Sequence, residues 1–326
     1  MSDQNYYARE EVSNSDLGEL RVSPRRFLMR KQREMQSKSA AMELGTLVHT
    51  FALEPDRFIM ADIEPVGGKM GEYIKAYFEI EKNDTIPKDE VASLAYSHAQ
   101  YKPAHTKPET VLKSFKNKPE NVAFYNFLKE ADGKIAVTQK DRQIIDGCLM
   151  SLRSHVVSNK LLFSEQKGVT AEAEKEIFFK LHDVDCKSKL DRVLIDDKNK
   201  KVTIVDLKTT SSQVYGECEP LNTNTGHLAR DWHVTGFMYS CLNYFYYRQL
   251  AFYIQGMQEL YPDYEVEAFI IAVDTKGSYD VAVYKLPVEW IQKGKEEIQC
   301  LLTEYKHYKE TDNWNVKQGF EETVAY

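Results

Sequence analysis

The sequence predicts an α/β (α+β) protein whose mixed central β-sheet contains an antiparallel hairpin and is flanked by helices. Three observations carry this prediction. Three strand-like runs follow one another between about residues 171 and 209. Two further apolar runs, 267–275 and 279–286, come after a long aromatic helical segment. Helical periodicity dominates before the first run and after the last one, so the helices are expected to cover the sheet.

Helices are expected to open the chain. The stretch SNSDL offers Asn14, Ser15 or Asp16 as the residue that caps a first helix. Pro24, directly after a serine, suits the first turn of a second helix. In 40–53, AAMELGTLVHTFAL, the apolar residues recur at helical spacing and predict a third helix.

The remaining elements follow from the same patterns. A single domain, 1–326, is expected, with 65–130 as a helical insertion and 211–231 as a loop rich in Gly, Asn and Thr. Strands are predicted at 173–181, 185–195, 200–210, 267–275 and 279–286, and helices at 137–162, 238–261 and 288–309.

The composition excludes several classes of protein. Hydrophobic residues make up 42% and charged residues 29%, as in an ordinary soluble protein. No apolar run reaches the roughly 18–20 residues of a membrane span. The polar, acidic start is unlike a secretory signal, so a cytoplasmic location is expected. The five cysteines are scattered and never at CxxC spacing, which argues against a disulfide framework or a cysteine-ligated metal.

The net charge of −7 and the pI near 5.7 give no overall sign of nucleic-acid binding. Such a function has to rest on local features. One basic patch, RVSPRRFLMRKQR, is either a contact surface for phosphates or a solvated helix face. Its basic residues are Arg21, Arg25, Arg26, Arg30, Lys31 and Arg33.

Charge inside the predicted strand TIVDLKTT, 203–210, is the main candidate for function. If Lys198 and Asn199 form a two-residue hairpin loop, Asp191 on the preceding strand lies directly across from Asp206. Lys208 then joins the same face of the sheet. Two carboxylates about 5 Å apart repel by roughly 3 kcal/mol at an effective dielectric constant of about 20.

A bridging divalent cation would turn this repulsion into attraction, and carboxylate oxygens suit Mg²⁺ or Mn²⁺. The alternative is a surface hairpin in which Lys208 merely pairs with Asp206. The apolar residues around Asp206 favour a strand covered on both sides. A slip of one residue in the register would put the two aspartates on opposite faces. Glu174 or Glu176, on the preceding strand, could approach the same metal or a second one.

The pattern Asp191…Asp206-Leu207-Lys208 resembles the core of the PD-(D/E)xK nuclease superfamily. GTLVH, 45–49, is similar to the G-x-x-x-H of RecB-type nucleases, and the resemblance implies that His49 is a metal ligand. The pair Gln249 and Tyr253 resembles their Q-x-x-x-Y, whose side chains face DNA phosphates.

Longer phrases resemble the RecE-type catalytic domain of exonuclease VIII enzymes. They cover about 10–60 and 135–285, whereas 65–130 fits poorly and nothing is carried over there. By this resemblance Glu174 matches the family's strand glutamate better than Glu176. The phrases are SNSDL, SPRRF, LGTLVHTFALEPDRF, KSKLDRVLID, IVDLKTT and YYRQLAFYIQGM.

The resemblance implies a restriction-endonuclease-like core and a Mg²⁺-dependent exonuclease that degrades linear double-stranded DNA from 5′ ends, leaving 3′ single strands for recombination. It also implies a ring-shaped homo-oligomer that works with a single-strand annealing protein in a phage or prophage system. We expect His49, Asp191, Asp206 and the Leu207 carbonyl to hold the metal, with Glu174 assisting. Lys208 would act on the attacking water or the developing charge, and Gln249, Tyr253 and Arg192 would contact DNA.

Three other functions stay open at the level of sequence. An iron–sulfur nuclease needs a cysteine quartet, which the scattered cysteines do not offer. An endonuclease of the same superfamily would cut closed circles. A non-catalytic DNA-binding or partner-recruiting protein on the same fold would bind without cleaving, although the presence of every motif residue argues against it.

Overall fold

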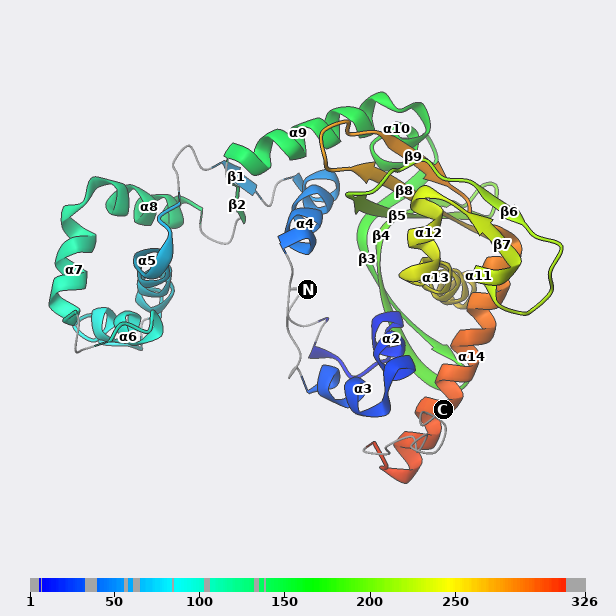
Figure 1. Ribbon diagram of the computed structural model, residues 1–326, viewed down its shortest axis with the longest axis horizontal. Coiled ribbons are helices and arrows are strands. Elements are labelled where there is room, and N and C mark those ends of the chain that lie inside the picture. Colours follow the sequence, from blue (N-terminus) through cyan, green and yellow to red (C-terminus); the bar gives the residue numbers. More distant parts are fainter. Residues whose placement is uncertain are drawn as a thin grey trace. The chain divides into compact units, whose positions relative to one another are not determined.

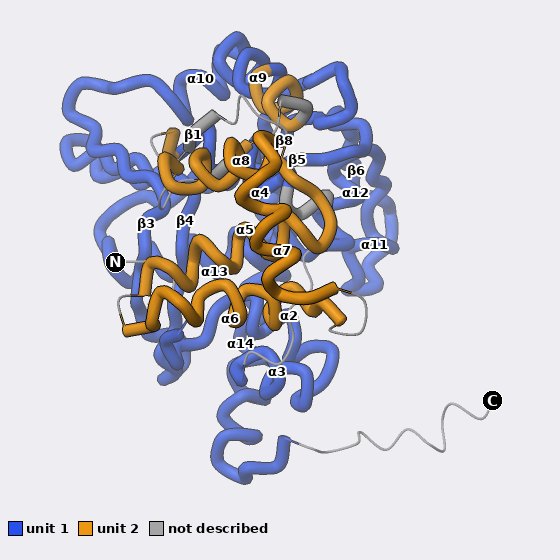
Figure 2. Tube along the Cα trace, turned by 90° about the vertical axis from the view of Figure 1, so that its left-hand side faces the viewer, with its two compact units in different colours: residues 1–53, 147–326 blue, residues 54–146 orange. Residues whose placement is uncertain are grey.

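The computed structural model describes residues 6, 8–32, 40–55, 58–60, 65–83, 85–102, 106–131, 135–137 and 139–314. The chain forms two compact units (Figure 2). The first joins 1–53 to 147–326, and the second is 54–146. The expected insertion, 65–130, lies within the second unit. That the whole chain is a single nuclease domain stays a prediction.

A five-stranded mixed sheet forms the centre of the first unit, with the order β3-β4-β5-β8-β9 (Figure 1). Neighbouring strands are antiparallel except for β5 and β8, which are parallel. The predicted fold class, a mixed sheet with an antiparallel hairpin, is confirmed. The strands are β3 (Val169–Leu181), β4 (Val184–Asp196), β5 (Lys201–Thr210), β8 (Glu265–Asp274) and β9 (Val281–Tyr284).

Two helices approach the sheet closely through glycines. Gly256, on α13, leaves no room for a side chain, because a Cβ there would lie 2.7 Å from the Phe179 ring of β3. Gly45 brings α4 equally close to β5. The helices of the first unit are α2 (Asn14–Val22), α3 (Pro24–Lys31), α4 (Ala40–Leu53), α10 (Val156–Leu162), α11 (Leu228–Asp231), α12 (Gly236–Asn243), α13 (Tyr246–Leu260) and α14 (Val288–Thr311).

Three predicted helices differ in detail. The first is capped by Ser13, one residue earlier than expected, because Ser13 and Asp16 form a reciprocal capping box. The predicted helix 137–162 is divided into α9 (Gln139–Ser154) and α10, with His155 capping the second piece. The aromatic helix 238–261 is interrupted at Phe245, whose φ of 56° is left-handed and cannot continue an α-helix.

The expected loop 211–231 contains some regular structure. β6 (Cys218–Pro220) pairs with β7 (Trp232–Val234) in a small antiparallel sheet, and α11 precedes β7. Short strands of this kind carry little apolar periodicity, so the sequence pattern does not reveal them.

The second unit has its own aromatic core, in which Tyr73, Tyr77, Phe115 and Tyr125 pack edge to face. The short strands β1 (Phe58–Met60) and β2 (Ile135–Val137) pair in parallel. The helices α5 (Gly68–Glu81), α6 (Val91–His98), α7 (Pro108–Asn117) and α8 (Pro119–Glu130) surround this core. In the described part of the chain, no helix is both long enough and apolar enough to cross a membrane.

Candidate active site

Three acidic residues lie in a row across the first three strands of the sheet. Between β4 and β5, Val193 pairs with Ile204 and Arg192 with Val205, so the next position places Asp191 across from Asp206. Between β3 and β4, the pairs on either side of Glu174 place it across from Asp191. The register predicted for the hairpin is therefore the observed one. The turn differs slightly, because the last pair, Asp196 and Lys201, leaves four residues between the strands.

The ladder between β3 and β4 is interrupted at this row, and the ladder between β4 and β5 ends just before it. Neither Glu174 with Asp191 nor Asp191 with Asp206 belongs to a ladder pair. Glu174 has a φ of 51°, which is rare for a glutamate inside a strand and costs on the order of 1–3 kcal/mol. Leu190 and Val193 of β4 both point into the main core although they are three residues apart. Regular alternation would send every second side chain to the core, so the strand is irregular by one residue here. The distortion turns the acidic side chains toward one place.

Asp191 is held by the backbone of the neighbouring strand. Its Oδ2 accepts a hydrogen bond of 2.7 Å from the Leu207 N–H. The Asp191 carboxylate thus provides a hydrogen-bond acceptor for the Leu207 amide at the point where the β4–β5 ladder ends. The Leu207 amide has this role in the structure, and the predicted role of the Leu207 carbonyl as a metal ligand stays a prediction.

His49 comes from α4, one helical turn after Gly45. Its Nε2 lies 2.8 Å from Asp191 Oδ2, and its Nδ1 lies 3.3 Å from Glu174 Oε1. A Cβ on Gly45 would lie 2.7 Å from Thr209 Oγ1 on β5. The G-x-x-x-H spacing therefore has a physical reason. The glycine lets the helix approach the strand, and the histidine four residues later reaches the acidic row.

We expect Gly45→Ala to lower the free energy of unfolding by about 1 kcal/mol. Overpacking against Thr209 costs about 1–3 kcal/mol, and the better helix propensity of alanine returns up to about 1 kcal/mol. Urea denaturation measures this difference. In a Thr209→Ala background the clash is absent, so the same change should be neutral or stabilising. Equal effects in both backgrounds would contradict the close approach.

Asp206 and Lys208 form a buried pair on β5. Lys208 Nζ lies 2.7 Å from Asp206 Oδ2, and the Asp206 side chain is only 1% exposed. The surface-hairpin alternative predicted this pair, but the strand around it is buried from Val202 to Leu207. Neither carboxylate oxygen of Asp206 has a hydrogen-bond partner of good geometry among the described residues. A buried carboxylate without hydrogen bonds is costly unless a further charge compensates for it.

The pKa values in the cluster reflect burial and charge. Burial raises the pKa of Asp206 to about 6, with Lys208 opposing the rise and Asp191 adding to it. Burial also raises the pKa of Glu174, against Lys189 and His49. Burial alone would lower the pKa of His49, but Asp191 and Glu174 outweigh it and the pKa is raised.

The pKa values of Asp191 and Lys208 are shifted in the directions that favour the charged forms of both groups. Burial would raise the pKa of Asp191, yet His49, Lys208 and the Leu207 amide lower it overall. Burial would lower the pKa of Lys208, yet Asp206 and Asp191 raise it overall. Lys208 is therefore an ammonium ion at any pH near neutrality.

The donor set fits a divalent cation. Ligand atoms of His49, Glu174 and Asp191 all lie within 4.8 Å of one another. Asp206 is not part of this cluster, and its carboxylate is paired with Lys208 instead. Of the predicted ligands, the structure thus brings His49 and Asp191 together with Glu174. Beside this cluster, Asp206 has an Oδ1 with no described partner and an Oδ2 paired only with Lys208, so a cation could bind this carboxylate as well. Carboxylate oxygens with one imidazole suit Mg²⁺ or Mn²⁺.

We expect the affinity for Mn²⁺ to rise with pH between 5.5 and 7.5. A ligand carboxylate must be ionised and a ligand imidazole must be neutral. The pKa of Asp206 is about 6, so this carboxyl group loses its proton in this window. The pKa of His49 is raised above its usual value, so loss of its proton adds to the rise in affinity at higher pH. Each released proton makes the affinity rise by about tenfold per pH unit. Isothermal titration calorimetry measures the effect, and a pH-independent affinity would contradict the ligand set.

Gln249 and Tyr253 lie on one face of α13 and form a hydrogen bond of 2.7 Å from the Gln249 amide to the Tyr253 hydroxyl. Burial raises the pKa of Tyr253 well above its usual value, and Asp206 and Asp191 add to the rise, so the hydroxyl is near the acidic row. Burial lowers the pKa of Arg192, whose Nε has no hydrogen-bond partner among the described residues. DNA contact by these three residues stays a prediction.

Three residues of the predicted basic patch form ion pairs within the fold. Asp16 pairs with Arg30 and Lys31, and Glu19 pairs with Arg26. Arg33 lies outside the described residues. The five cysteines are free thiols, and Cys148, Cys186 and Cys241 are buried.

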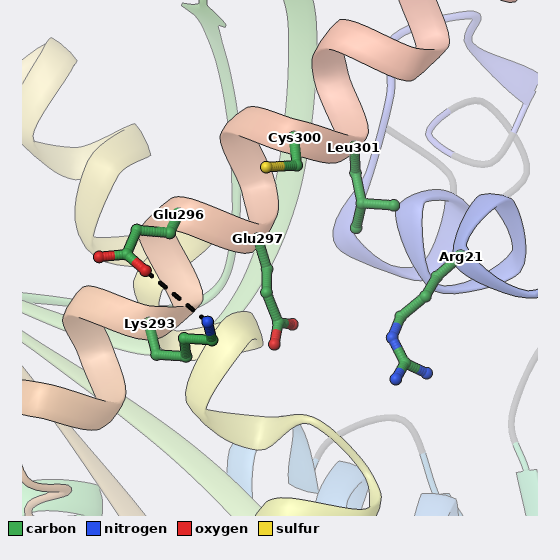
Figure 3. Close-up of a pocket in the computed structure, with 6 residues that line it drawn as sticks. All are labelled: Arg21, Lys293, Glu296, Glu297, Cys300 and Leu301. Atoms are coloured by element: carbon green, nitrogen blue, oxygen red, sulfur yellow. Dashed lines mark ion pairs between the residues drawn. The ribbon is translucent and has the colours of Figure 1, made fainter. Parts of the chain in front are cut away.

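A hollow of about 310 Å³ lies in another part of the first unit. Figure 3 shows the residues that line it. It lies between α14 and Arg21 of α2, and Lys293 pairs with Glu296 at its edge. None of the residues that line it belongs to the site described above.

Two residues of the site are absent from the sequence-based prediction. Lys189 Nζ lies 2.6 Å from Glu174 Oε2, and Lys208 Nζ lies 5.0 Å from the centre of the Tyr246 ring. Period-two alternation could have placed Lys189 on the face of Asp191. Tyr246 could not have been singled out, because it stands in a run of aromatic residues that mostly form the core.

Comparisons with known proteins agree with this geometry. Residues 13–323 match a family described as "PDDEXK-like domain of unknown function (DUF3799)". The chain belongs to this family. It is therefore a PD-(D/E)xK-type protein, as its motifs predicted, and a closer relation to RecE-type enzymes stays a prediction.

Solved structures show the same fold. The chain resembles the crystal structure of a candidate exonuclease from Eubacterium rectale, with 11% sequence identity and a TM-score of 0.50. The match covers 97% of this chain and 88% of the other. No curated protein matches the chain. At this identity the likeness shows the restriction-endonuclease-like fold alone.

Proposed function

We propose that this protein is a Mg²⁺-dependent exodeoxyribonuclease that hydrolyses linear double-stranded DNA from its 5′ ends and leaves 3′ single strands, with Mn²⁺ able to replace Mg²⁺. The observation that carries the proposal is the row of Glu174, Asp191 and Asp206 at the point where the strand ladders are interrupted, with His49 and Lys208 beside it. Membership in a PDDEXK-like family supports nuclease chemistry, and the name of the structural neighbour is consistent with exonuclease action.

Asp191, Asp206, Glu174 and His49 would hold the metal, which when bound would polarise the scissile phosphate and lower the pKa of a water molecule. The Leu207 amide holds Asp191 in place by donating to its Oδ2, a bond that does not involve Oδ1. The strained backbone at Glu174 keeps that carboxylate beside His49. These restraints preorganise the ligands before substrate arrives.

Lys208 would stabilise the negative charge that develops on the phosphate. Its raised pKa keeps it protonated, and its burial strengthens its electrostatic effect on a nearby phosphate. The amide of Gln249, held by Tyr253, would orient a phosphate oxygen, and Arg192 would add a charge-assisted contact.

Digestion of linear duplex labelled at either the 5′ or the 3′ end, with a closed circle as control, tests the proposal. We expect early release of the 5′ label with Mg²⁺, slower loss of the 3′ label, an intact circle and no reaction with EDTA. Cleavage of the circle would show an endonuclease instead. Binding of DNA without any cleavage would show the non-catalytic alternative. A ring assembly and an annealing partner are further parts of this proposal.

A further inference from the structure

An aromatic path leads from Lys208 to the protein surface. The Lys208 ammonium lies 5.0 Å from the centre of the Tyr246 ring. The Tyr246 ring centre lies 5.8 Å from that of Tyr244, and the two rings are tilted by 32°. Tyr244 is 68% exposed. Two consecutive ring contacts thus connect the lysine of the candidate active site with a tyrosine ring that faces solvent.

The backbone fixes this arrangement. α12 ends at Asn243, and the Tyr244 N–H donates to the Ser240 carbonyl. The left-handed Phe245 then turns the chain before α13 begins at Tyr246. Two guanidinium groups contact the ring of Phe245, with Arg21 4.1 Å and Arg248 5.1 Å from its centre. The break in the helix directs neighbouring tyrosines differently, one toward Lys208 and one toward solvent.

Tyr246 packs against the ring of Tyr244 on the side that faces the protein. The buried Phe237 packs against the Tyr246 ring, with 6.0 Å between the ring centres, and stacks on Tyr284. The Tyr284 hydroxyl donates to the Val214 carbonyl. This packing holds Tyr246 in place, so Tyr244 has a fixed aromatic neighbour on one side and solvent on the other. Among the residues that the structure describes, neither core packing nor a hydrogen bond of its hydroxyl accounts for so exposed a ring.

We propose that Tyr244 stacks on an unpaired nucleobase of the DNA strand being cleaved, next to the phosphate held at Lys208; this rests on the proposed nuclease function. Exposed aromatic rings and cationic groups together bind single-stranded nucleic acid, because the ring takes a base face and the cation takes the backbone. Here the Tyr246 ring lies between Tyr244 and Lys208, so the base and the phosphate would occupy neighbouring places along the strand. Stacking needs a base whose face is free, so Tyr244 acts on the separated end of the strand. Tyr244 is a positioning residue for the substrate.

Cleavage kinetics on a duplex with a short frayed end test the proposal. Tyr244→Ala should lower kcat/KM about tenfold, mainly through a higher KM. Tyr244→Phe should retain activity within about twofold, because stacking needs the ring and not the hydroxyl. The matched control is Tyr239→Ala on α12, since Tyr239 is 58% exposed and the described residues show no ring contact between it and Tyr246. That variant should cleave normally.

Substrates with one abasic nucleotide identify the stacked base. A scan along the frayed strand should find one position where loss of the base slows the wild-type protein about tenfold and the Tyr244→Ala variant not at all. Wild-type rates at every position, or equal losses in the Tyr239 and Tyr244 variants, would overturn the role of Tyr244. An inactive wild-type protein would instead overturn the proposed function. The two failures are therefore distinguishable.

Discussion

Replacing Asp206 by asparagine is expected to reduce cleavage of linear duplex by at least about 10³-fold, because several kcal/mol of metal-derived stabilisation of the transition state would be lost. Asparagine keeps the shape of the side chain but removes the charge that a cation needs. Both carboxylate oxygens of Asp206 are buried and lack a hydrogen bond of good geometry among the described residues. The Lys208 ammonium is therefore the main described group that would compete with a cation for this carboxylate. Initial rates with end-labelled duplex measure the effect.

A thermal unfolding experiment separates loss of metal binding from loss of fold. Saturating Mn²⁺ should raise the Tm of the wild-type protein, because a ligand that binds only the folded state stabilises it. The Asp206→Asn variant should unfold cooperatively and show little or no such rise. Asp183→Asn, at a side chain 93% exposed, is the matched control and should behave like the wild type. Full activity of the Asp206 variant would disprove the assignment.

Replacing Lys208 by methionine is expected to slow cleavage by about 10²–10³-fold while Mn²⁺ still binds. Methionine is unbranched and close in length, so it fills the space between Asp206 and the Tyr246 ring without supplying charge. Loss of the ammonium will raise the pKa of Asp206 further, since Lys208 opposes that rise. Metal affinity should therefore be compared over a series of pH values, so that a change in the ionisation of Asp206 is separated from a loss of metal binding.

Lys201→Met on the same strand is the control for this change. Lys201 pairs with Glu267 at 2.8 Å and is 37% exposed, away from the acidic row. We expect it to retain wild-type rates. A Lys208 variant that loses rate and Mn²⁺ affinity in equal measure would indicate that the lysine only maintains the site and does not act on the phosphate.

Much of the site could be predicted because strand pairing follows simple counting. The apolar runs on both sides of the turn at 197–200 determine the register of the hairpin, and the register places Asp191 across from Asp206. For the G-x-x-x-H and Q-x-x-x-Y motifs, the common helix face of each pair could also be predicted, because residues four apart lie on the same face of a helix. Both pairs lie where these spacings require, with Gly45 against β5 and Gln249 bonded to Tyr253.

Other features depend on interactions that no local pattern contains. The left-handed conformations of Glu174 and Phe245 oppose the preference of those residue types, and surrounding contacts impose them. The break in the aromatic helix follows from Phe245, so the exposure of Tyr244 could not be predicted. The pairing of Lys189 with Glu174 depends on the distortion of two strands together.

By itself, the sequence determined the fold class, the order of the strands along the chain and the side-chain types of the acidic row, because hydrophobic periodicity and motif spacing are local. Only the tertiary structure decided which carboxylates gather around His49. That choice depends on how closely α4 approaches β5 and on where the ladder between β3, β4 and β5 opens. It also depends on burial, which raises the pKa of Asp206, and on Lys208, which pairs with one of its oxygens.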